Sequence, residues 1–120
     1  MAIICKAAIT DGLGNFKIEE IEVNDPQDDE VLVKIQAAGL CHTDHDSLNW
    51  GRNIIIGHEG AGVVVKMGKD VKGLMPGDKV ILSWATHCGH CFQCLEGNEH
   101  LCEVASPVAA GRQQLYSRPR

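Results

Sequence analysis

Four cysteines lie close together near the end of this 120-residue sequence. They are Cys88, Cys91, Cys94 and Cys102, with the spacing C-x2-C-x2-C-x7-C. The start of the chain, MAIICKAAIT, lacks the pattern of a secretion signal, so thiols at this spacing indicate a metal site rather than disulfides. Zinc fits best, because four sulfurs complete a tetrahedral shell and leave no position for water or substrate. The cluster therefore predicts a structural zinc ion.

An iron–sulfur site is the alternative for this cluster. Bacterial ferredoxins use the run C-x2-C-x2-C-x3-C-P, whereas here seven residues precede the last cysteine and Glu103 follows it. Zinc is therefore favoured over an iron–sulfur site or a group of free thiols. Since the cysteines already satisfy the metal, His87, His90 and His100 are expected at the surface.

Cys41 and His58 could form a second metal site with a position left open for a substrate. By themselves they are a weak signal, because a buried cysteine is often only a small apolar residue and a histidine is often a satisfied core residue. Cys5 lies in an apolar stretch and is expected in the core.

Short strands separated by glycine-containing turns must position these residues. Strands are expected over Ile3–Ile9, Phe16–Val23, Glu30–Ala38, Gly60–Met67 and Lys79–Ser83. The alternation slips at Glu19 and Glu20, which indicates a β-bulge there. A short helix is expected within Cys41–Leu48, capped by Thr43 or Asp44. This pattern predicts a mainly β fold, a small antiparallel barrel with short helices rather than alternating βαβ units.

The composition suits one domain with an aliphatic core, at 44% hydrophobic but only 4% aromatic residues. The net charge is −5 and no run of five basic residues exists, so nucleic acid and anionic membranes are not expected as partners. No apolar run approaches the roughly 18 residues of a membrane span. We expect a cytoplasmic protein, because zinc thiolates persist in a reducing compartment.

Neither glycine cluster is a dinucleotide-binding fingerprint. Gly57–Gly62 lacks the G-x-G-x-x-G spacing and precedes an expected strand rather than a helix, and Gly12-x-Gly14 lacks the third glycine. Backbone freedom in tight turns is the expected role of these glycines.

Four motifs occur here in the order that a known family shows. They are Gly39–Asp44 (GLCHTD), Gly57–Val64 (GHEGAGVV), Gly77–Val80 (GDKV) and the four-cysteine lobe. Over about residues 2–105 the chain thereby resembles the zinc-dependent alcohol dehydrogenases of the medium-chain dehydrogenase/reductase superfamily. The resemblance implies the N-terminal catalytic domain, a partly open antiparallel β-barrel similar to the GroES co-chaperonin.

The resemblance also implies a catalytic zinc for alcohol–aldehyde interconversion with NAD or NADP. Cys41 and His58 match the family's ligands of that zinc, which lowers the pKa of a substrate hydroxyl. Glu59 matches a carboxylate that lies near the zinc and can bind it transiently. In this family context the substrate is a small alcohol or aldehyde.

Three further residues match the family's functional positions. Thr43 matches the hydroxyl that begins a proton relay from the substrate, although an ordinary helix cap is the alternative for it. Asp44 matches a carboxylate that orients the zinc-binding histidine. His42 matches a position that contacts the cofactor pyrophosphate in some relatives.

The chain also departs from the family pattern. We expect residues 1–110 to form the domain, with the zinc lobe over 87–103, and residues 111–120 to be a disordered polar tail. The Rossmann cofactor domain is expected to be absent. No cysteine follows the four-cysteine lobe to supply the family's third catalytic ligand, so Glu59 or water would complete the site at Cys41 and His58.

Three functions remain open on these grounds. The first is the catalytic portion of a zinc alcohol dehydrogenase, inactive as an isolated chain. The second is a stand-alone zinc-stabilised barrel that acts as a binding module, and the third is a subunit that complements a separate Rossmann chain. Self-association is expected in each case, because the face that covers the cofactor domain in relatives would be exposed.

Overall fold

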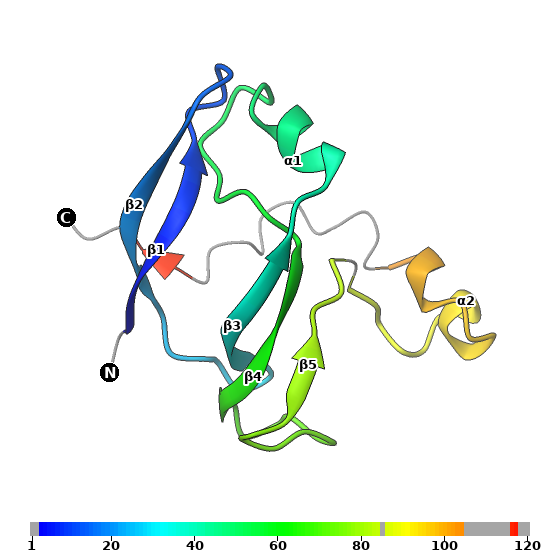
Figure 1. Cartoon of the computed structure of the whole chain (residues 1–120). Coiled ribbons are helices and arrows are strands. Elements are labelled where there is room, and N and C mark those ends of the chain that lie inside the picture. The colour runs from blue at the N-terminus through cyan, green and yellow to red at the C-terminus, as the bar shows by residue number, and fades with distance from the viewer. Residues whose placement is uncertain (1–2, 85, 105–115, 118–120) are drawn as a thin grey trace. The chain divides into compact units, whose positions relative to one another are not determined.

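The computed structural model describes residues 3–84, 86–104 and 116–117 (Figure 1). The chain divides into two compact units, one comprising Met1–Leu82 with Leu115–Arg120 and the other Ser83–Gln114. The first unit contains all the described strands, and the second contains only short helical turns. None of the helices in the described ranges reaches the length and apolar character that a membrane crossing requires.

One sheet of the first unit has the order β1-β2-β6. Strands β1 (Ile3–Thr10) and β2 (Phe16–Val23) form an antiparallel hairpin, and the backbone of β6 (Tyr116–Ser117) pairs with the end of β2. The Asp11 carboxylate closes the hairpin by accepting hydrogen bonds from the backbone of Leu13 at 2.7 Å and of Asn15 at 3.1 Å.

The other sheet has the order β3-β4-β5 and is also antiparallel. Its strands are β3 (Val31–Gly39), β4 (Glu59–Met67) and β5 (Lys79–Ile81). The β3–β4 register shifts between Leu32 and Val33 and shifts again between Ile35 and Ala37. The two irregularities compensate, so the last residue of β3, Gly39, pairs with the first of β4, Glu59.

Each sheet contributes buried aliphatic side chains. Ile9 and Ile21 from the first sheet are buried, as is Val64 from the second. A single bridge joins Ile9 to Ile55 in the segment that leads into β4. Burial of β-branched side chains of this kind is what stabilises strands this short.

Helix α1 (His42–Ser47) follows β3 directly. Its end is attached to the β1–β2 hairpin, because the Leu48 carbonyl accepts bonds from the Thr10 hydroxyl at 3.3 Å and the Gly14 amide at 2.9 Å. Gly12 has a φ of 76°, and a side chain there would collide with the Gly51–Arg52 backbone. The hairpin thus holds the helix that carries several candidate site residues.

The second unit consists of α2 (Phe92–Leu95) and the 3₁₀ helix η1 (Glu99–Leu101). Among its described residues only two, Cys94 and Cys102, are buried. Large apolar side chains such as Phe92 and Leu95 are exposed, so no hydrophobic core holds the described part of this unit together.

The mainly β fold class expected from the sequence is confirmed, but several local expectations are wrong. The β1–β2 register runs without a shift through Glu19 and Glu20, so no bulge occurs there. The side chains of β2 therefore alternate between the two faces of the hairpin without interruption, and Phe16 and Ile18 are exposed. Cys5 is exposed rather than in the core.

Two boundary expectations also change. The N-cap of α1 is Cys41, not Thr43 or Asp44, and β5 ends at Ile81, two residues before the expected Ser83. The disordered tail expected over 111–120 lies outside the described residues, apart from the two that form β6.

Candidate metal centres

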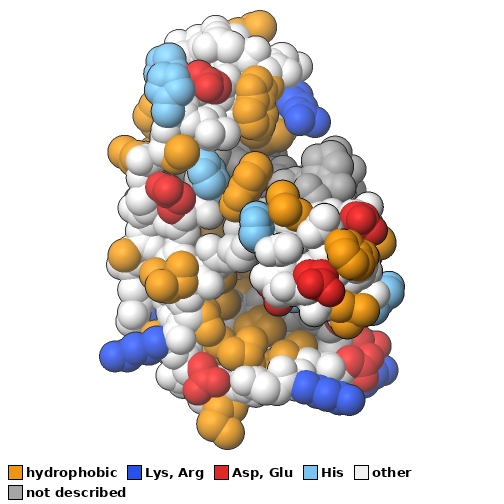
Figure 2. Space-filling view, turned by 90° about the vertical axis from the view of Figure 1, so that its right-hand side faces the viewer, with side chains coloured by type: hydrophobic (Ala, Val, Ile, Leu, Met, Phe, Trp, Pro, Cys, Tyr) orange, Lys and Arg blue, Asp and Glu red, His pale blue; other side chains and the backbone are white. Residues whose placement is uncertain are grey.

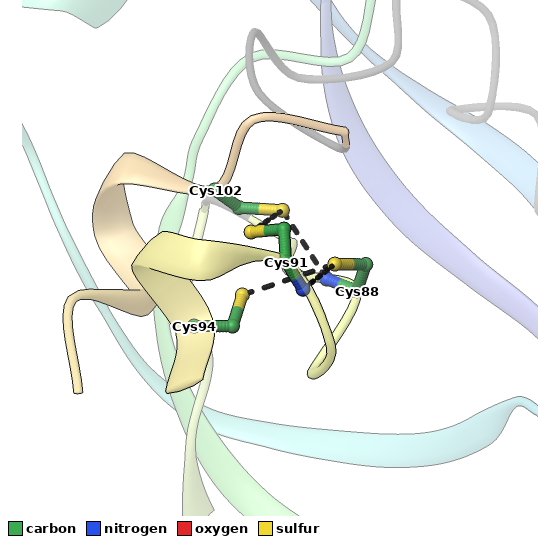
Figure 3. A group of neighbouring side chains, drawn as sticks. All are labelled: Cys88, Cys91, Cys94 and Cys102. Atoms are coloured by element: carbon green, nitrogen blue, oxygen red, sulfur yellow. Dashed lines mark hydrogen bonds between the residues drawn. The ribbon is translucent and has the colours of Figure 1, made fainter. Parts of the chain in front are cut away.

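The four lobe cysteines converge on one point in the second unit, as Figure 3 shows. All four sulfur atoms lie within 4.8 Å of one another. The Sγ atoms of Cys88 and Cys94 are 3.9 Å apart, and those of Cys91 and Cys102 are 4.0 Å apart. Sulfurs bound to a tetrahedral zinc at about 2.3 Å are separated by about 3.8 Å, so the observed spacing fits zinc closely.

Backbone amides also point at these sulfurs. The Cys88 sulfur accepts bonds from the amides of Cys91 at 3.2 Å and His90 at 3.4 Å, and the Cys102 sulfur accepts one from the Cys88 amide at 3.3 Å. Donors of this kind stabilise the thiolate over the thiol, and the thiolate is the form that binds metal.

The lobe has opposing effects on its own thiol pKa values. The backbone amide of Cys94, followed by that of Glu103, lowers the pKa of the Cys91 thiol. Burial raises the pKa of the Cys94 thiol to about 11. A buried thiolate needs a compensating positive charge, and the described residues of the lobe include no Lys or Arg. A divalent cation bound by all four sulfurs would provide that charge.

The histidines beside the lobe are not part of the cluster. His87, His90 and His100 are all exposed, as the sequence predicted. His90 instead places its Nδ1 3.0 Å from the Cys88 carbonyl oxygen.

The register of β3 and β4 builds a second cluster in the first unit. Gly39 pairs with Glu59, so Cys41 just after β3 and His58 just before β4 are brought together from positions 17 apart in the sequence. One ligand atom from each of Cys41, His58 and Glu59 lies within 4.8 Å of the others. The Glu59 carboxylate lies against Gly39, where a Cβ would be 2.6 Å from its Oε2. A larger residue at position 39 would require the Glu59 side chain to move from this position.

Asp44 connects the two firm members of this second cluster. One carboxylate oxygen accepts the Cys41 backbone N–H at 2.9 Å, and the other lies 3.1 Å from His58 Nδ1. Asp44 is only 7% exposed, which makes these contacts strong. Because an ionised carboxylate can only accept, Nδ1 carries the proton in this contact, and a metal at His58 would bind to Nε2.

The pKa values in this cluster favour an ionised pair. The Thr43 backbone N–H lowers the pKa of the Cys41 thiol, with further contributions from the Thr43 hydroxyl and His58. The hydrogen bond to Cys41 raises the pKa of His58, and the charge of Asp44 acts in the same direction. Both shifts favour the ionised pair, and the thiolate is the form of Cys41 that binds a cation.

His42, the candidate cofactor contact, is exposed at the start of α1. It belongs to a third group of possible ligands, with His45 and Asp46, whose donor atoms also lie within 4.8 Å of one another. Sequence reasoning missed His45 and Asp46. Their i, i+3, i+4 spacing from His42 was the available signal, once the helix is known to begin at His42.

Residues 27–118 match the family model described as the alcohol dehydrogenase GroES-like domain. The chain belongs to this family. An alcohol dehydrogenase B of Mycobacterium tuberculosis is 39% identical over 101 residues, covering 80% of this chain and 27% of that protein. An alcohol dehydrogenase 1 of Artemisia annua is 44% identical over 115 residues, covering 91% of this chain and 30% of that protein. The chain therefore spans less than a third of the length of these curated alcohol dehydrogenases.

Solved structures of alcohol dehydrogenases show the same fold. A cobalt- and zinc-bound thermostable alcohol dehydrogenase from Pyrobaculum aerophilum matches with a TM-score of 0.76 at 36% identity, covering 85% of this chain and 33% of that one. A zinc-binding-domain alcohol dehydrogenase from Burkholderia ambifaria matches with a TM-score of 0.75 at 37% identity, covering 86% and 29%. The GroES-like fold expected from the motifs is confirmed.

Proposed function

We propose that this chain is the catalytic-domain portion of a zinc-dependent alcohol dehydrogenase, which interconverts an alcohol and an aldehyde with a nicotinamide cofactor. The observation that carries the proposal is the double contact of Asp44, which holds the Cys41 backbone and the His58 ring beside each other. A histidine that only fills space in a core would not need this arrangement, in which one buried carboxylate both caps α1 at Cys41 and contacts the His58 ring.

In this proposal the second cluster is the catalytic metal site. Cys41 and His58 are the protein ligands, and Glu59 or water completes the shell. Zinc bound there supplies a Lewis acid for the substrate oxygen. Asp44 keeps the proton on His58 Nδ1 and aims Nε2 at the ion.

Two further residues of the N-terminal turn of α1 have roles in the reaction. Thr43 is half-buried and hydrogen-bonded to the Cys41 thiol. Its hydroxyl is therefore positioned to accept the proton of the substrate hydroxyl and to pass it on. His42 is exposed and is assigned to the cofactor pyrophosphate. The four lobe cysteines hold the structural zinc.

Cofactor binding requires a nucleotide-binding domain, in the same polypeptide or in another. The 120 residues contain no G-x-G-x-x-G loop, so we assign the choice of NAD or NADP to that domain and expect no turnover from these residues alone. Leu40, next to Cys41, is 93% exposed, and other apolar side chains are open on the face in Figure 2. Such side chains suit a covering domain or a second copy of the chain. Zinc thiolates require a reducing compartment, and the proposed location is the cytoplasm.

Zinc analysis of protein purified without added metal tests the proposal. We expect about two zinc ions per chain, one lost on Cys88→Ser and the other on His58→Ala. Cys5→Ser, at an exposed cysteine outside both clusters, is the matched control and leaves the zinc content unchanged. If His58→Ala left the zinc content unchanged, the proposed catalytic metal site would be refuted and a zinc-stabilised binding module would be favoured.

Activity assays separate the remaining possibilities. With a nucleotide-binding domain supplied, Thr43→Val should abolish oxidation of benzyl alcohol, because the proton path is lost, and should leave zinc content intact, because every zinc ligand remains. Steady NADH production by the metal-loaded 120-residue chain alone would contradict the need for that domain. Gel filtration at high concentration tests self-association, which a strict monomer would refute.

A further inference from the structure

The outer face of α1 carries three side chains outside both metal centres, and one of them, His42, is also the residue assigned above to the cofactor pyrophosphate. His42 and His45 stack, with ring centroids 5.6 Å apart and an interplanar angle of 27°. The Asp46 carboxylate lies near both rings, with Oδ1 3.4 Å from His42 Nε2 and 3.7 Å from His45 Nδ1. We propose that these three side chains form a separate surface site for a divalent first-row transition ion such as Ni²⁺ or Zn²⁺.

The spacing of the donor atoms fits such an ion. Ligand atoms at about 2.1 Å from a metal lie about 3.4 Å apart in tetrahedral and about 3.0 Å apart in octahedral geometry. The two distances to Asp46, 3.4 Å and 3.7 Å, are close to these values. The ligand atoms of all three residues lie within 4.8 Å of one another, and rotation of the exposed side chains can bring the two histidine nitrogens closer. Imidazole nitrogens with one carboxylate are a donor set that suits nickel, zinc and copper.

The three donors are accessible and their scaffold is fixed. The side chains of His42, His45 and Asp46 are 85%, 73% and 55% exposed, so a hydrated ion reaches them with little rearrangement. The opposite face of α1 is anchored, because Asp44 and Ser47 are buried there. The helix therefore presents its ligands on a fixed turn, and solvent molecules fill the remaining coordination positions.

A solvated group of histidines beside an acid is the ordinary alternative. Both histidine–carboxylate distances exceed the usual 2.7–3.2 Å of a strong hydrogen bond, roughly by 0.2 to 0.5 Å. The carboxylate is therefore not committed to either ring. The ring nitrogens can turn toward an ion that all three donors share.

Nickel titration of the zinc-loaded full chain tests the site. We expect one Ni²⁺ to bind in addition to the zinc, and His45→Gln or Asp46→Asn to weaken it more than about tenfold. His100→Gln, at an exposed histidine of the other unit, is the matched control and leaves Ni²⁺ binding unchanged. Equal affinity of the wild-type protein and His45→Gln would overturn the proposal.

Two spectroscopic measurements distinguish this site from nonspecific binding and from binding to cysteine. Bound Ni²⁺ should broaden the ring proton signals of His42 and His45 in the unmutated protein and spare His87 and His100. Uniform broadening of every exposed histidine would mean adventitious binding and overturn the site. A thiolate-to-nickel charge-transfer band would show that the ion had entered a cysteine site instead, with the same consequence. These outcomes do not depend on the proposed dehydrogenase function.

Discussion

Removing the lobe zinc should unfold the second unit and leave the first unit folded. The change is Cys102→Ser, which deletes one sulfur ligand at a residue only 2% exposed. A serine hydroxyl is a poor zinc ligand, so the ion should be lost. The described part of this unit buries no side chain except Cys94 and Cys102, and therefore has no apolar core that could replace the metal.

The magnitude follows from how little else holds the lobe. Structural zinc contributes about 10 kcal/mol or more to the folding of small zinc domains. Isolated helices shorter than about 12 residues are unstable in water, and α2 has four residues and η1 has three. We expect hydrogen-exchange protection of the lobe amides to fall by at least about three orders of magnitude, equivalent to about 4 kcal/mol.

Native-state hydrogen exchange is the assay. The reporters in the lobe are the amides of Leu95, Asn98 and Leu101, which donate to the carbonyls of Cys91, Gln93 and Asn98 respectively. Amides of the β1–β2 hairpin serve as the internal reference and should keep their protection. Cys5→Ser lies in that hairpin and should change neither zinc content nor lobe protection. A Cys102→Ser protein with zinc lost and lobe protection intact would refute the reasoning.

Three further predictions concern the first unit. In zinc-stripped protein, the rate of alkylation of Cys41 should reach half its maximum at a pH below the ordinary cysteine pKa of about 8.5, because hydrogen bonds from Thr43 favour the thiolate. Thr43→Val should move that midpoint upward, and an unchanged midpoint would contradict the assignment. His58 has a raised pKa, so protons should begin to displace zinc from its site as the pH falls through values above the ordinary 6.5. Asp44→Asn removes a charge that raises this pKa, so in zinc-stripped protein the ring proton signals of His58 should titrate with a lower midpoint. Val64→Ala should lower the free energy of unfolding in urea by about 2 kcal/mol, since Val64 is 1% exposed. A change below about 0.5 kcal/mol would mean that the site collapses around the smaller side chain.

Much of the metal chemistry was predictable because its ligands are local in the sequence. The lobe cysteines all lie within residues 88–102, so few chain conformations separate them and their spacing alone indicates the cluster. The existence and order of the strands were also predictable, because successive side chains of a strand point to opposite faces and this produces alternating aliphatic and polar residues in the sequence.

The errors arise where burial depends on neighbouring elements. The slip at Glu19 and Glu20 indicates a bulge only if Phe16 and Ile18 must both be buried. The hairpin instead keeps a continuous register and leaves both side chains exposed. A pattern of hydrophobicity does not say which face of a strand another layer covers.

The sequence by itself determined the family and the four-cysteine cluster, because those rest on residue types and short spacings, whereas it offered Cys41, His58 and Glu59 only through the family resemblance. Only the tertiary structure decided that Cys41 and His58 meet, since this depends on two compensating irregularities that set Gly39 opposite Glu59. It also decided that Asp44 caps a helix and contacts His58 with one carboxylate. Contacts between distant segments follow from strand register and helix start, and these are set by packing over the whole unit rather than by any local run of residues.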